Sequence, residues 1–294
     1  MIIVQLKGGL GNQMFQYATA RRLAYITGAF LKLDTTWFDT VSADIKRKYE
    51  LSIFNIKEEF ASQREIARLK EYTLNGKPNL RTRIFKLLSN HKPTHIVEKY
   101  FHFDPEVLNL KDDVYLDGYW QSEKYFHDIR ALLIKEFSVK PISDDRNKNM
   151  ADTIRSSESV SVHVRRGDYV SNQSTNAYHG ICSIEYYYKA TAIITQKVKD
   201  PHFFLFSDDP EWVRENLTFD YPATYVDINS PEKAHEDMRL LSLCKHHVIA
   251  NSSFSWWGAW LSQSPDKIVV APKKWFKDSS INTKDLLPAN WITL

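Results

Sequence analysis

Two adjacent arginines, Arg165 and Arg166, follow Ser159–Val164, a run that is typical of a buried β-strand. Strand alternation sends the side chains of His163 and Arg165 to the same face. Two cations at a strand end are costly to bury unless they meet an anion, and a guanidinium group matches phosphate oxygens with two parallel hydrogen bonds. Asp168 is near enough in sequence to pair with one arginine and orient it. This segment therefore indicates an anion-binding site, with a solvated charge cluster as the alternative.

A second candidate anion site follows residues 1–6, which are mostly apolar and typical of a strand. The tract Gly8–Gly11 is glycine-rich, and a helix is expected from about Asn12, which can cap it, to about Thr27. Glycines let the main chain approach a ligand, and a helix start presents amide groups to an anion. The spacing fits neither the dinucleotide-binding nor the P-loop fingerprint. Both a phosphate-binding role and a purely structural turn therefore remain open.

The acidic pair Asp208 and Asp209 follows another expected strand, at residues 202–207. Either carboxylate could cap the next helix, and an acidic pair can also hold a metal ion. A single pair without a partner carboxylate elsewhere is a poor metal site, and the two arginines offer another way to neutralise a diphosphate. No metal site is therefore predicted.

Hydroxyl-bearing residues follow the expected strand at residues 247–250. Ser252, Ser253 and Ser255 stand at the start of a helix, where hydroxyl and amide groups together are expected to form another anion-binding nest. Trp256 and Trp257 next to them are expected in the core. Asp237, within an upstream helix, is either a solvated surface residue or an acceptor for the N1 and N2 edge of guanine.

The second half of the chain alternates between strand and helix patterns. Strands are expected at 159–164, 202–207, 224–226, 247–250 and 268–271, and helices at 184–199, from 210, at 232–244 and at 253–263. This order predicts a parallel sheet with helices on both faces. Ligands bind such sheets at the carboxyl ends of the strands, which is where the arginines, the acidic pair and the serines fall.

The first half is expected to form a second α/β domain. Strands are predicted at 1–6, 30–33 and 114–119 and helices at 12–27, 58–71 and 122–137, with an irregular excursion at 74–95. The polar stretch 138–150 contains a proline and is the best domain boundary. The predicted domains are therefore 1–145 and 151–294, two Rossmann-like domains facing a cleft.

The composition supports a folded, enzyme-sized chain. It has 294 residues, of which 43% are hydrophobic and 26% charged, and a formal net charge of +3. These values exclude disorder and disfavour nucleic acid as the partner. The cysteines, Cys182 and Cys244, lack the spacing of a zinc site. No signal peptide precedes the first strand and no apolar run approaches the ~20 residues of a membrane span. A cytoplasmic enzyme is expected, and peripheral association with the inner membrane face stays open.

Four tracts together resemble the bacterial α-1,2-fucosyltransferases of glycosyltransferase family 11. They are GGLGNQMFQYA, GYWQSEKYF, HVRRGDY and NSSFSWWGAWL, spread over nearly the whole chain in the family's order. HVRRGDY alone is also similar to an element of protein O- and α-1,6-fucosyltransferases. The resemblance implies a glycosyltransferase of the GT-B fold that needs no metal or other cofactor. It would transfer fucose from GDP-β-L-fucose, with inversion, to the 2-hydroxyl of a terminal galactoside.

The resemblance also implies roles for individual residues. Arg165 would contact the β-phosphate and stabilise the leaving GDP, with Arg166 and Asp168 supporting the same loop. His163 and Asp237 would contact guanine. Further donor contacts are implied for Ser252, Ser253 and Ser255 at the phosphates, for Asp208, and for Gly9, Gly11 and Asn12 from the opposite domain.

The acceptor is implied to bind on the side of the first domain, at the tract from Asp117 to Glu123. Asp208 and Asp209 occupy the place of an acidic pair in the α-1,6 relatives. The candidates for a general base are Asp34, Asp117, Glu123 and Asp208.

Three other functions remain as alternatives. The first is a different GDP-fucose-dependent fucosyltransferase, making an α-1,6 or O-linked product. The second is a non-catalytic carbohydrate-binding protein that uses its tryptophans and tyrosines as sugar platforms. The third is a nucleotide-binding regulatory protein without turnover. A basic strand end has no purpose in the carbohydrate-binding alternative.

Overall fold

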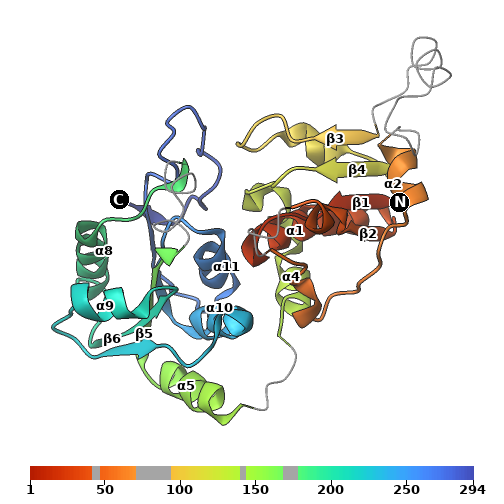
Figure 1. The fold of residues 1–294 in the computed structure, drawn as a ribbon. Helices are drawn as coiled ribbons and strands as arrows, with labels where there is room; N and C mark the ends of the chain where they lie inside the picture. Colours follow the sequence, from red (N-terminus) through yellow and green to blue (C-terminus); the bar gives the residue numbers. More distant parts are fainter. Residues whose placement is uncertain (42–46, 71–93, 140–143, 168–177) are drawn as a thin grey trace. The chain divides into compact units, whose positions relative to one another are not determined.

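The computed structural model describes residues 1–41, 47–70, 94–139, 144–167 and 178–294, which form two compact units (Figure 1). Unit 1 comprises Met1–Ser138 and Asn282–Leu286, and unit 2 comprises Val139–Ile281 and Leu287–Leu294. The segment Asn282–Leu286 belongs to unit 1 because Asp285 is bonded there. Ser122 Oγ donates to the Asp285 carbonyl at 2.6 Å, and Lys124 Nζ pairs with Asp285 Oδ1 at 2.5 Å.

Unit 1 is built on a four-stranded parallel sheet in the order β2-β1-β4-β3 (Figure 1). Its strands are β1 Ile2–Gln5, β2 Leu31–Asp34, β3 His95–Val97 and β4 Val114–Asp117. Its helices are α1 Leu10–Thr27, α2 Gln63–Leu69 and α4 Arg130–Glu136. Single 3-10 turns lie at η1 Thr36–Asp39, η2 Leu51–Ile53, η3 Pro105–Asn109, η4 Glu123–Tyr125 and η5 His127–Ile129.

The first helix begins two residues earlier than predicted. Gly9 is the N-cap of α1 and no side chain caps it, so Asn12 lies inside the helix and the capping role predicted for it is wrong. The turn is held instead by Gln13, whose Nε2 donates to the Gly8 carbonyl at 3.0 Å and to the Lys48 carbonyl at 2.9 Å. The helix ends at Thr27, as predicted, and Gly28 follows it in the left-handed region, with φ 68°.

Unit 2 contains a six-stranded parallel sheet in the order β10-β9-β8-β5-β6-β7. Its strands are β5 Glu158–Val164, β6 Pro201–Ser207, β7 Ala223–Val226, β8 His246–Val248, β9 Val269–Ala271 and β10 Ile292–Thr293. Its helices are α5 Asp145–Arg155, α8 Ile184–Thr195, α9 Pro210–Asn216, α10 Ala234–Leu243 and α11 Ser253–Leu261, with the 3-10 turn η6 Pro231–Lys233. The chain starts at the central strand and builds outward in both directions, which is the doubly wound order.

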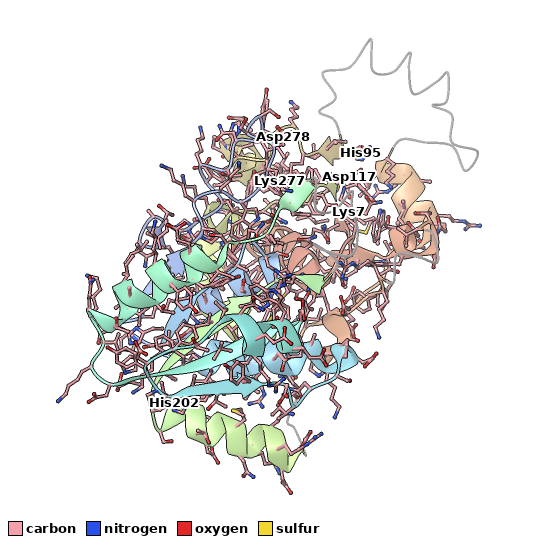
Figure 2. All side chains as sticks on the ribbon, turned by 60° about the vertical axis from the view of Figure 1, so that its left-hand side comes forward. Lys7, His95, Asp117, His202, Lys277 and Asp278 are labelled. Atoms are coloured by element: carbon pink, nitrogen blue, oxygen red, sulfur yellow. The ribbon has the colours of Figure 1, made fainter. Side chains whose placement is uncertain are left out.

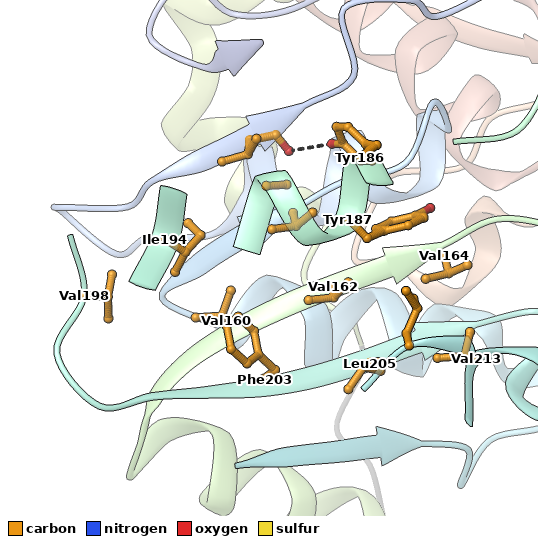
Figure 3. Packing of buried hydrophobic residues seen from close by; sticks show 14 residues of the cluster. Val160, Val162, Val164, Tyr186, Tyr187, Ile194, Val198, Phe203, Leu205 and Val213 are labelled. Atoms are coloured by element: carbon orange, nitrogen blue, oxygen red, sulfur yellow. Dashed lines mark hydrogen bonds between the residues drawn. The ribbon is translucent and has the colours of Figure 1, made fainter. Parts of the chain in front are cut away.

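Helices cover both faces of the unit 2 sheet, as the alternation of patterns predicts. Phe203 and Leu205 of β6 pack in a cluster with Tyr187 and Ile194 of α8 (Figure 3). Phe204 and Phe206, which alternate with them along β6, pack in a second cluster with residues from α5 and α10. Because neighbouring residues of a strand point to opposite faces, an almost wholly apolar strand is required here.

Several predicted elements differ from the structure. The helix expected at 122–137 is broken into η4, η5 and α4. The helix expected at 58–71 is only Gln63–Leu69, where Ser62 and Glu65 form a capping box. The stretch 138–150, which the sequence predicts as the domain boundary, contains the start of α5, capped by Asp144, with Asn147, Ala151 and Ile154 buried along one face. Most of the excursion at 74–95 lies outside the described residues, and its end forms part of β3.

Both cysteines are free thiols, Cys244 buried and Cys182 half-buried. Within the residues that the structure describes, no helix combines the length and the apolar character needed to cross a membrane.

Candidate functional site

The two arginines stand at the carboxyl end of β5, the strand at which the order of the unit 2 sheet reverses. β5 pairs with β6 on one side and with β8 on the other. From β5 the chain proceeds to β6 and β7, and only then returns to form β8. Open parallel sheets bind ligands outside the strand ends at such a switch point. Arg165 and Arg166 directly follow β5, and Ser252 lies shortly after the end of β8.

Asp208 holds both arginines in position. Its Oδ2 lies 3.0 Å from Arg165 Nη1, and its Oδ1 accepts the main-chain N–H of Arg166 at 2.8 Å. The residue after the arginines must be small, because a Cβ on Gly167 would stand 2.5 Å from Asp208 Oδ2. The side chains of Arg165 and Asp208 are 24% and 26% exposed. The pair is therefore partly open and can receive a ligand.

Arg166 is built into the framework of unit 2. Its guanidinium carbon lies 3.8 Å from the centroid of the Trp212 ring, and its Nε donates to Asp209 Oδ2 at 3.2 Å. Asp209 also caps α9, as predicted for the acidic pair, by accepting the N–H of Trp212 at 3.3 Å. The stack and the ion pair bind the end of β5 to α9, so Arg165 is the better placed of the two to meet an anion.

The acidic pair is thus committed to the arginines and to a helix cap. Over the described part of the chain, no three or more histidine, cysteine, aspartate or glutamate side chains are grouped to hold a metal ion. Asp168, predicted to pair with an arginine, lies outside the described residues.

His163 is a buried neutral imidazole. It is 5% exposed, and burial together with the nearby charge of Arg165 lowers the pKa of His163 to about 3. Its Nδ1 has no hydrogen-bond partner among the described residues. The ring lies 5.4 Å from that of Phe254 in α11. A buried polar atom without a partner is costly, so Nδ1 suits a hydrogen bond with a ligand.

Asp237 lies in the first turn of α10. Its Oδ1 accepts from Asn229 Nδ2 at 2.8 Å, and Asn229 in turn exchanges hydrogen bonds of 2.7 and 3.0 Å with Asn147. Burial raises the pKa of Asp237 to about 6, although the bond from Asn229 lowers it. A half-buried carboxylate whose pKa is raised by burial is a candidate for ligand binding.

The serines at the start of α11 have different surroundings. Ser252 is the N-cap, and its Oγ accepts the N–H of Phe254 at 3.3 Å. Ser253 is half-buried. Ser255 is fully buried, and its hydroxyl lies within 3.4 Å of the Ala250 and Ser252 carbonyls. The hydroxyl of Ser255 is therefore turned into the protein, while Ser252 and Ser253 stand nearer the helix start.

Asn251, which precedes these serines, has a structural role that the sequence pattern does not identify. Its Nδ2 lies 3.0, 3.2 and 3.1 Å from the carbonyl oxygens of His179, Gly180 and Trp275, and its two N–H groups are shared among these three acceptors. One buried amide thus connects two loops to the end of β8. No sequence signal shows this role, because the three partners are main-chain atoms far away along the chain.

In unit 1, the glycine-rich turn is held by side chains of α1. The Lys7 N–H donates to Gln16 Oε1 at 3.0 Å, and Gln121 Nε2 donates to Asn12 Oδ1 at 2.8 Å. The main-chain N–H of Leu10, in the first turn of the helix, donates to the carboxylate of Glu50. Gly9 lies close to Arg47, whose Nη1 would be 3.2 Å from a Cβ on Gly9. A cation and a carboxylate therefore flank this turn, and the sequence pattern identified neither.

A polar cluster occupies the carboxyl edge of the unit 1 sheet, where Lys7, His95 and Asp117 lie together (Figure 2). Asp117 Oδ1 is 2.9 Å from Lys7 Nζ and Oδ2 is 3.4 Å from His95 Nε2. The bond with His95 and the bond and charge of Lys7 lower the pKa of Asp117 well below its ordinary value. A carboxylate held in this way is a weak proton acceptor.

The other acidic candidates of unit 1 differ in burial. Asp34 is 1% exposed and accepts from the hydroxyl of Tyr115 at 2.5 Å. Glu123 is half-buried in the first turn of η4.

The whole chain, residues 1–294, matches the model of glycosyl transferase family 11. It is 33% identical over 302 residues to alpha-1,2-colitosyltransferase from Escherichia coli, with 100% of this chain and 99% of that protein covered. It is 34% identical over 307 residues to the E. coli O-antigen biosynthesis glycosyltransferase WbnK, covering 98% and 99%. A bovine galactoside 2-alpha-L-fucosyltransferase, SEC1, is 26% identical over 88% of this chain and 64% of its own length.

Solved structures show the same fold. NodZ alpha-1,6-fucosyltransferase co-crystallised with GDP superimposes with a TM-score of 0.51 at 16% identity, covering 88% of this chain and 91% of that one. A variant of Arabidopsis thaliana FUT1 in complex with GDP gives a TM-score of 0.50 at 12% identity, covering 98% and 74%. The predicted GT-B-like α/β fold is confirmed, and so is the resemblance drawn from the four tracts.

Proposed function

The chain belongs to glycosyltransferase family 11, and from this premise we propose that it transfers L-fucose from GDP-β-L-fucose to the 2-hydroxyl of a terminal galactoside. The transfer inverts the anomeric carbon and uses no metal ion. The observation that carries the proposal is Arg165 at the switch point of the unit 2 sheet, oriented by Asp208 at 3.0 Å. The α-1,2 linkage and the galactoside are supported by the names of the E. coli and bovine relatives.

The chemistry requires stabilisation of a leaving diphosphate. As the bond between fucose and phosphate breaks, the sugar becomes oxocarbenium-like and negative charge gathers on GDP. A donor aimed at that charge and fixed beforehand contributes a large part of catalysis. Arg165 supplies a guanidinium fork held by Asp208, and the amide groups at the start of α11 add to it. Loss of Arg165 is expected to reduce turnover by about 10²–10³.

Three side chains of unit 2 are suited to guanine. The N1 and N2 groups of guanine are donors, and the Asp237 carboxylate is an acceptor in the first turn of α10. His163 is held neutral and has a buried Nδ1 that needs a partner. Phe254 packs beside His163 and offers an apolar surface. Gly9, Gly11 and Asn12 of unit 1 remain proposed contacts of the donor.

The acceptor is assigned to the tract from Asp117 to Glu123. Among the candidate bases, Asp34 is bonded to Tyr115, Asp117 to Lys7 and His95, and Asp208 to the two arginines. Glu123, whose charge acts on Arg130, stays a candidate beside these three for the residue that accepts the proton of the acceptor hydroxyl. Metal independence is supported by Asp208 and Asp209, whose carboxylates already face guanidinium groups.

GDP-colitose is a second candidate donor. The 33% identity to an alpha-1,2-colitosyltransferase over 100% of this chain favours it. Colitose is L-fucose without the 3-hydroxyl. A site that bonds the 3-hydroxyl of fucose would discriminate strongly against colitose, whereas a site without that bond would discriminate only weakly between the two donors.

The test is GDP release from GDP-fucose and GDP-colitose, with β-galactosides such as lactose and N-acetyllactosamine, with and without EDTA. We expect galactoside-dependent release from GDP-fucose, unchanged by EDTA, and an α-1,2 linkage in the product. A higher kcat/KM with GDP-colitose would assign the second donor. An α-1,6 linkage, or loss of activity with EDTA, would contradict the proposal. If GDP raised the melting temperature of the protein but no GDP were released from either donor, the protein would be a nucleotide-binding protein without turnover.

A further inference from the structure

Glu98, which directly follows β3, binds the main chain of the neighbouring strand end with both oxygens of its carboxylate. Oε2 accepts the N–H of Tyr119 at 2.7 Å, and Oε1 accepts the N–H of Trp120 at 2.9 Å. The main-chain N–H of Glu98 also donates to the Asp117 carbonyl at 2.8 Å, which extends the β3–β4 pairing by one residue. Glu98 is therefore bonded to three of the four residues at Asp117–Trp120.

The turn that Glu98 holds has an uncommon backbone. Trp120 has a φ of 57°, in the left-handed region that residues with a side chain rarely adopt, and it is 1% exposed. Such a conformation persists only where surrounding bonds enforce it. A Cβ on Gly118 would overlap Glu98 Cβ and lie 2.9 Å from Glu98 Oε2, so the turn also needs a glycine there. The N–H of Ser122 adds a bond to the Trp120 carbonyl at 2.8 Å.

The same turn directs the polar groups of the unit 1 sheet edge. Asp117 ends β4 just before it, and Tyr119 lies within it. Lys7 Nζ is 2.9 Å from Asp117 Oδ1 and 5.0 Å from the centroid of the Tyr119 ring. Asp117, Lys7 and the 36% exposed ring of Tyr119 therefore present hydrogen-bonding groups and an aromatic face together, which is the chemistry that suits a sugar ring. A change in the path of the turn would separate these groups.

We propose that Glu98 is a positioning residue for acceptor binding, because its two oxygens fix the turn that places Asp117 and Tyr119 against the galactoside. This inference rests on the proposed function. A carboxylate is required, because both of its oxygens accept. Glutamine would have the right length but would turn an NH₂ group toward one of the two N–H donors. Burial raises the pKa of Glu98, and the bonds from Tyr119 and Trp120 oppose that shift, followed by the charge of Lys7.

The test compares Glu98→Gln with wild type and with Glu106→Gln, a change at an exposed glutamate of the same unit. Acceptor KM, donor KM, kcat and the Kd for GDP are measured. For Glu98→Gln we expect the acceptor KM to rise about tenfold or more, as for loss of a hydrogen bond to a charged group. Donor KM and the GDP Kd should stay within about twofold of wild type. The substitution leaves the proposed donor-binding residues of unit 2 unchanged, and substitutions at sites without shared partners act independently. Glu106→Gln should match wild type throughout.

Gly118→Ala provides a second, independent disturbance of the same turn and should show the same selective rise in acceptor KM. It decides the question if Glu98→Gln does not fold. A folded variant with wild-type acceptor KM, or one that loses only kcat or donor affinity, would overturn the positioning role. Failure of the proposed function would look different, because the wild-type protein itself would then release no GDP in response to a galactoside.

Discussion

Asp208 Oδ2 lies 3.0 Å from Arg165 Nη1, while the second oxygen of Asp208 accepts the main-chain N–H of Arg166 at 2.8 Å. One carboxylate thus sets both the direction of a guanidinium group and the path of the chain after β5. Charge-assisted bonds of this kind are among the strong ones in proteins.

Asp208→Asn should therefore lower kcat by about tenfold to a hundredfold, because loss of a charged hydrogen bond costs about 1.5–3 kcal/mol. Asparagine keeps one oxygen for the N–H of Arg166 but turns an NH₂ group toward the Arg165 guanidinium. GDP release at saturating donor and acceptor measures kcat. Asp209→Asn is the control, since Asp209 pairs with Arg166 and caps α9. Asp209→Asn should affect the melting temperature more than kcat, and a folded Asp208→Asn enzyme with wild-type kcat would refute the role.

Arg165→Lys tests whether the shape of the cation matters as well as its charge. Lysine keeps the charge but lacks the planar fork that bonds two phosphate oxygens. We expect Arg165→Ala to lose about 10²–10³ in kcat, and Arg165→Lys to recover only a minor part of it. Arg155→Ala, at an exposed pair in α5, serves as the control. Equal activity of the lysine variant and the wild type would show that simple charge is sufficient.

The donor KM should depend on pH through Asp237. Burial raises the pKa of Asp237 to about 6 in the protein without ligand. The carboxylate is therefore ionised and able to accept two guanine N–H groups above that pH, and it is increasingly protonated below it. We expect the donor KM to rise as the pH falls from 7 to 5. Asp237→Asn should have a raised donor KM that no longer changes over this range, measured with acceptor at saturation.

His163 offers a contrast within the same experiment. Burial and the charge of Arg165 lower the pKa of His163 to about 3, so it stays neutral between pH 5 and 7. If the donor KM of Asp237→Asn still rose as the pH fell from 7 to 5, a group other than Asp237 would be responsible for the pH dependence.

The tryptophan pair of α11 should matter for stability. Trp257 is fully buried, and its ring lies 5.1 Å from those of Trp256 and Trp260. Trp257→Ala should reduce the free energy of unfolding by about 3–5 kcal/mol, since it leaves a large cavity. Tyr25→Ser, at a side chain that is 58% exposed, should change it by no more than about 0.5 kcal/mol. Denaturant unfolding measures both, and a small effect of Trp257→Ala would mean that the core around α11 refills the space.

Local pattern was sufficient to predict most of unit 2. β5 alternates valine with polar residues and β6 is mainly apolar, and both are long strands, while α8 and α11 carry their own serine caps, Ser183 and Ser252. Prediction failed where stability comes from distant partners. β3 has only three residues, and its pairing with β4 across a long stretch of chain defines it. The break between η4 and α4 is likewise invisible in a sequence whose periodicity continues through it.

In the candidate site, too, local pattern predicts some features, and contacts between distant residues determine the others. Residue type and position at strand ends indicate Arg165, Asp208 and Ser252, because a parallel sheet brings its carboxyl ends to one edge. Which carboxylate meets which arginine could not be predicted. Asp168 is closest to the arginines in sequence, yet Asp208 and Asp209 form the pairs among the described residues.

By itself, the sequence determined the α/β class, the strand that carries the arginines and the resemblance to a fucosyltransferase family, since these depend on local pattern and short motifs. The tertiary structure alone decided that Asp208 orients Arg165, that Arg166 is locked against Trp212, that His163 is neutral and that Glu98 holds the turn at Gly118–Trp120. Each of these depends on distance, burial or hydrogen bonding between residues far apart in the chain. Such relationships arise only when folding brings distant residues into contact and removes water from around them.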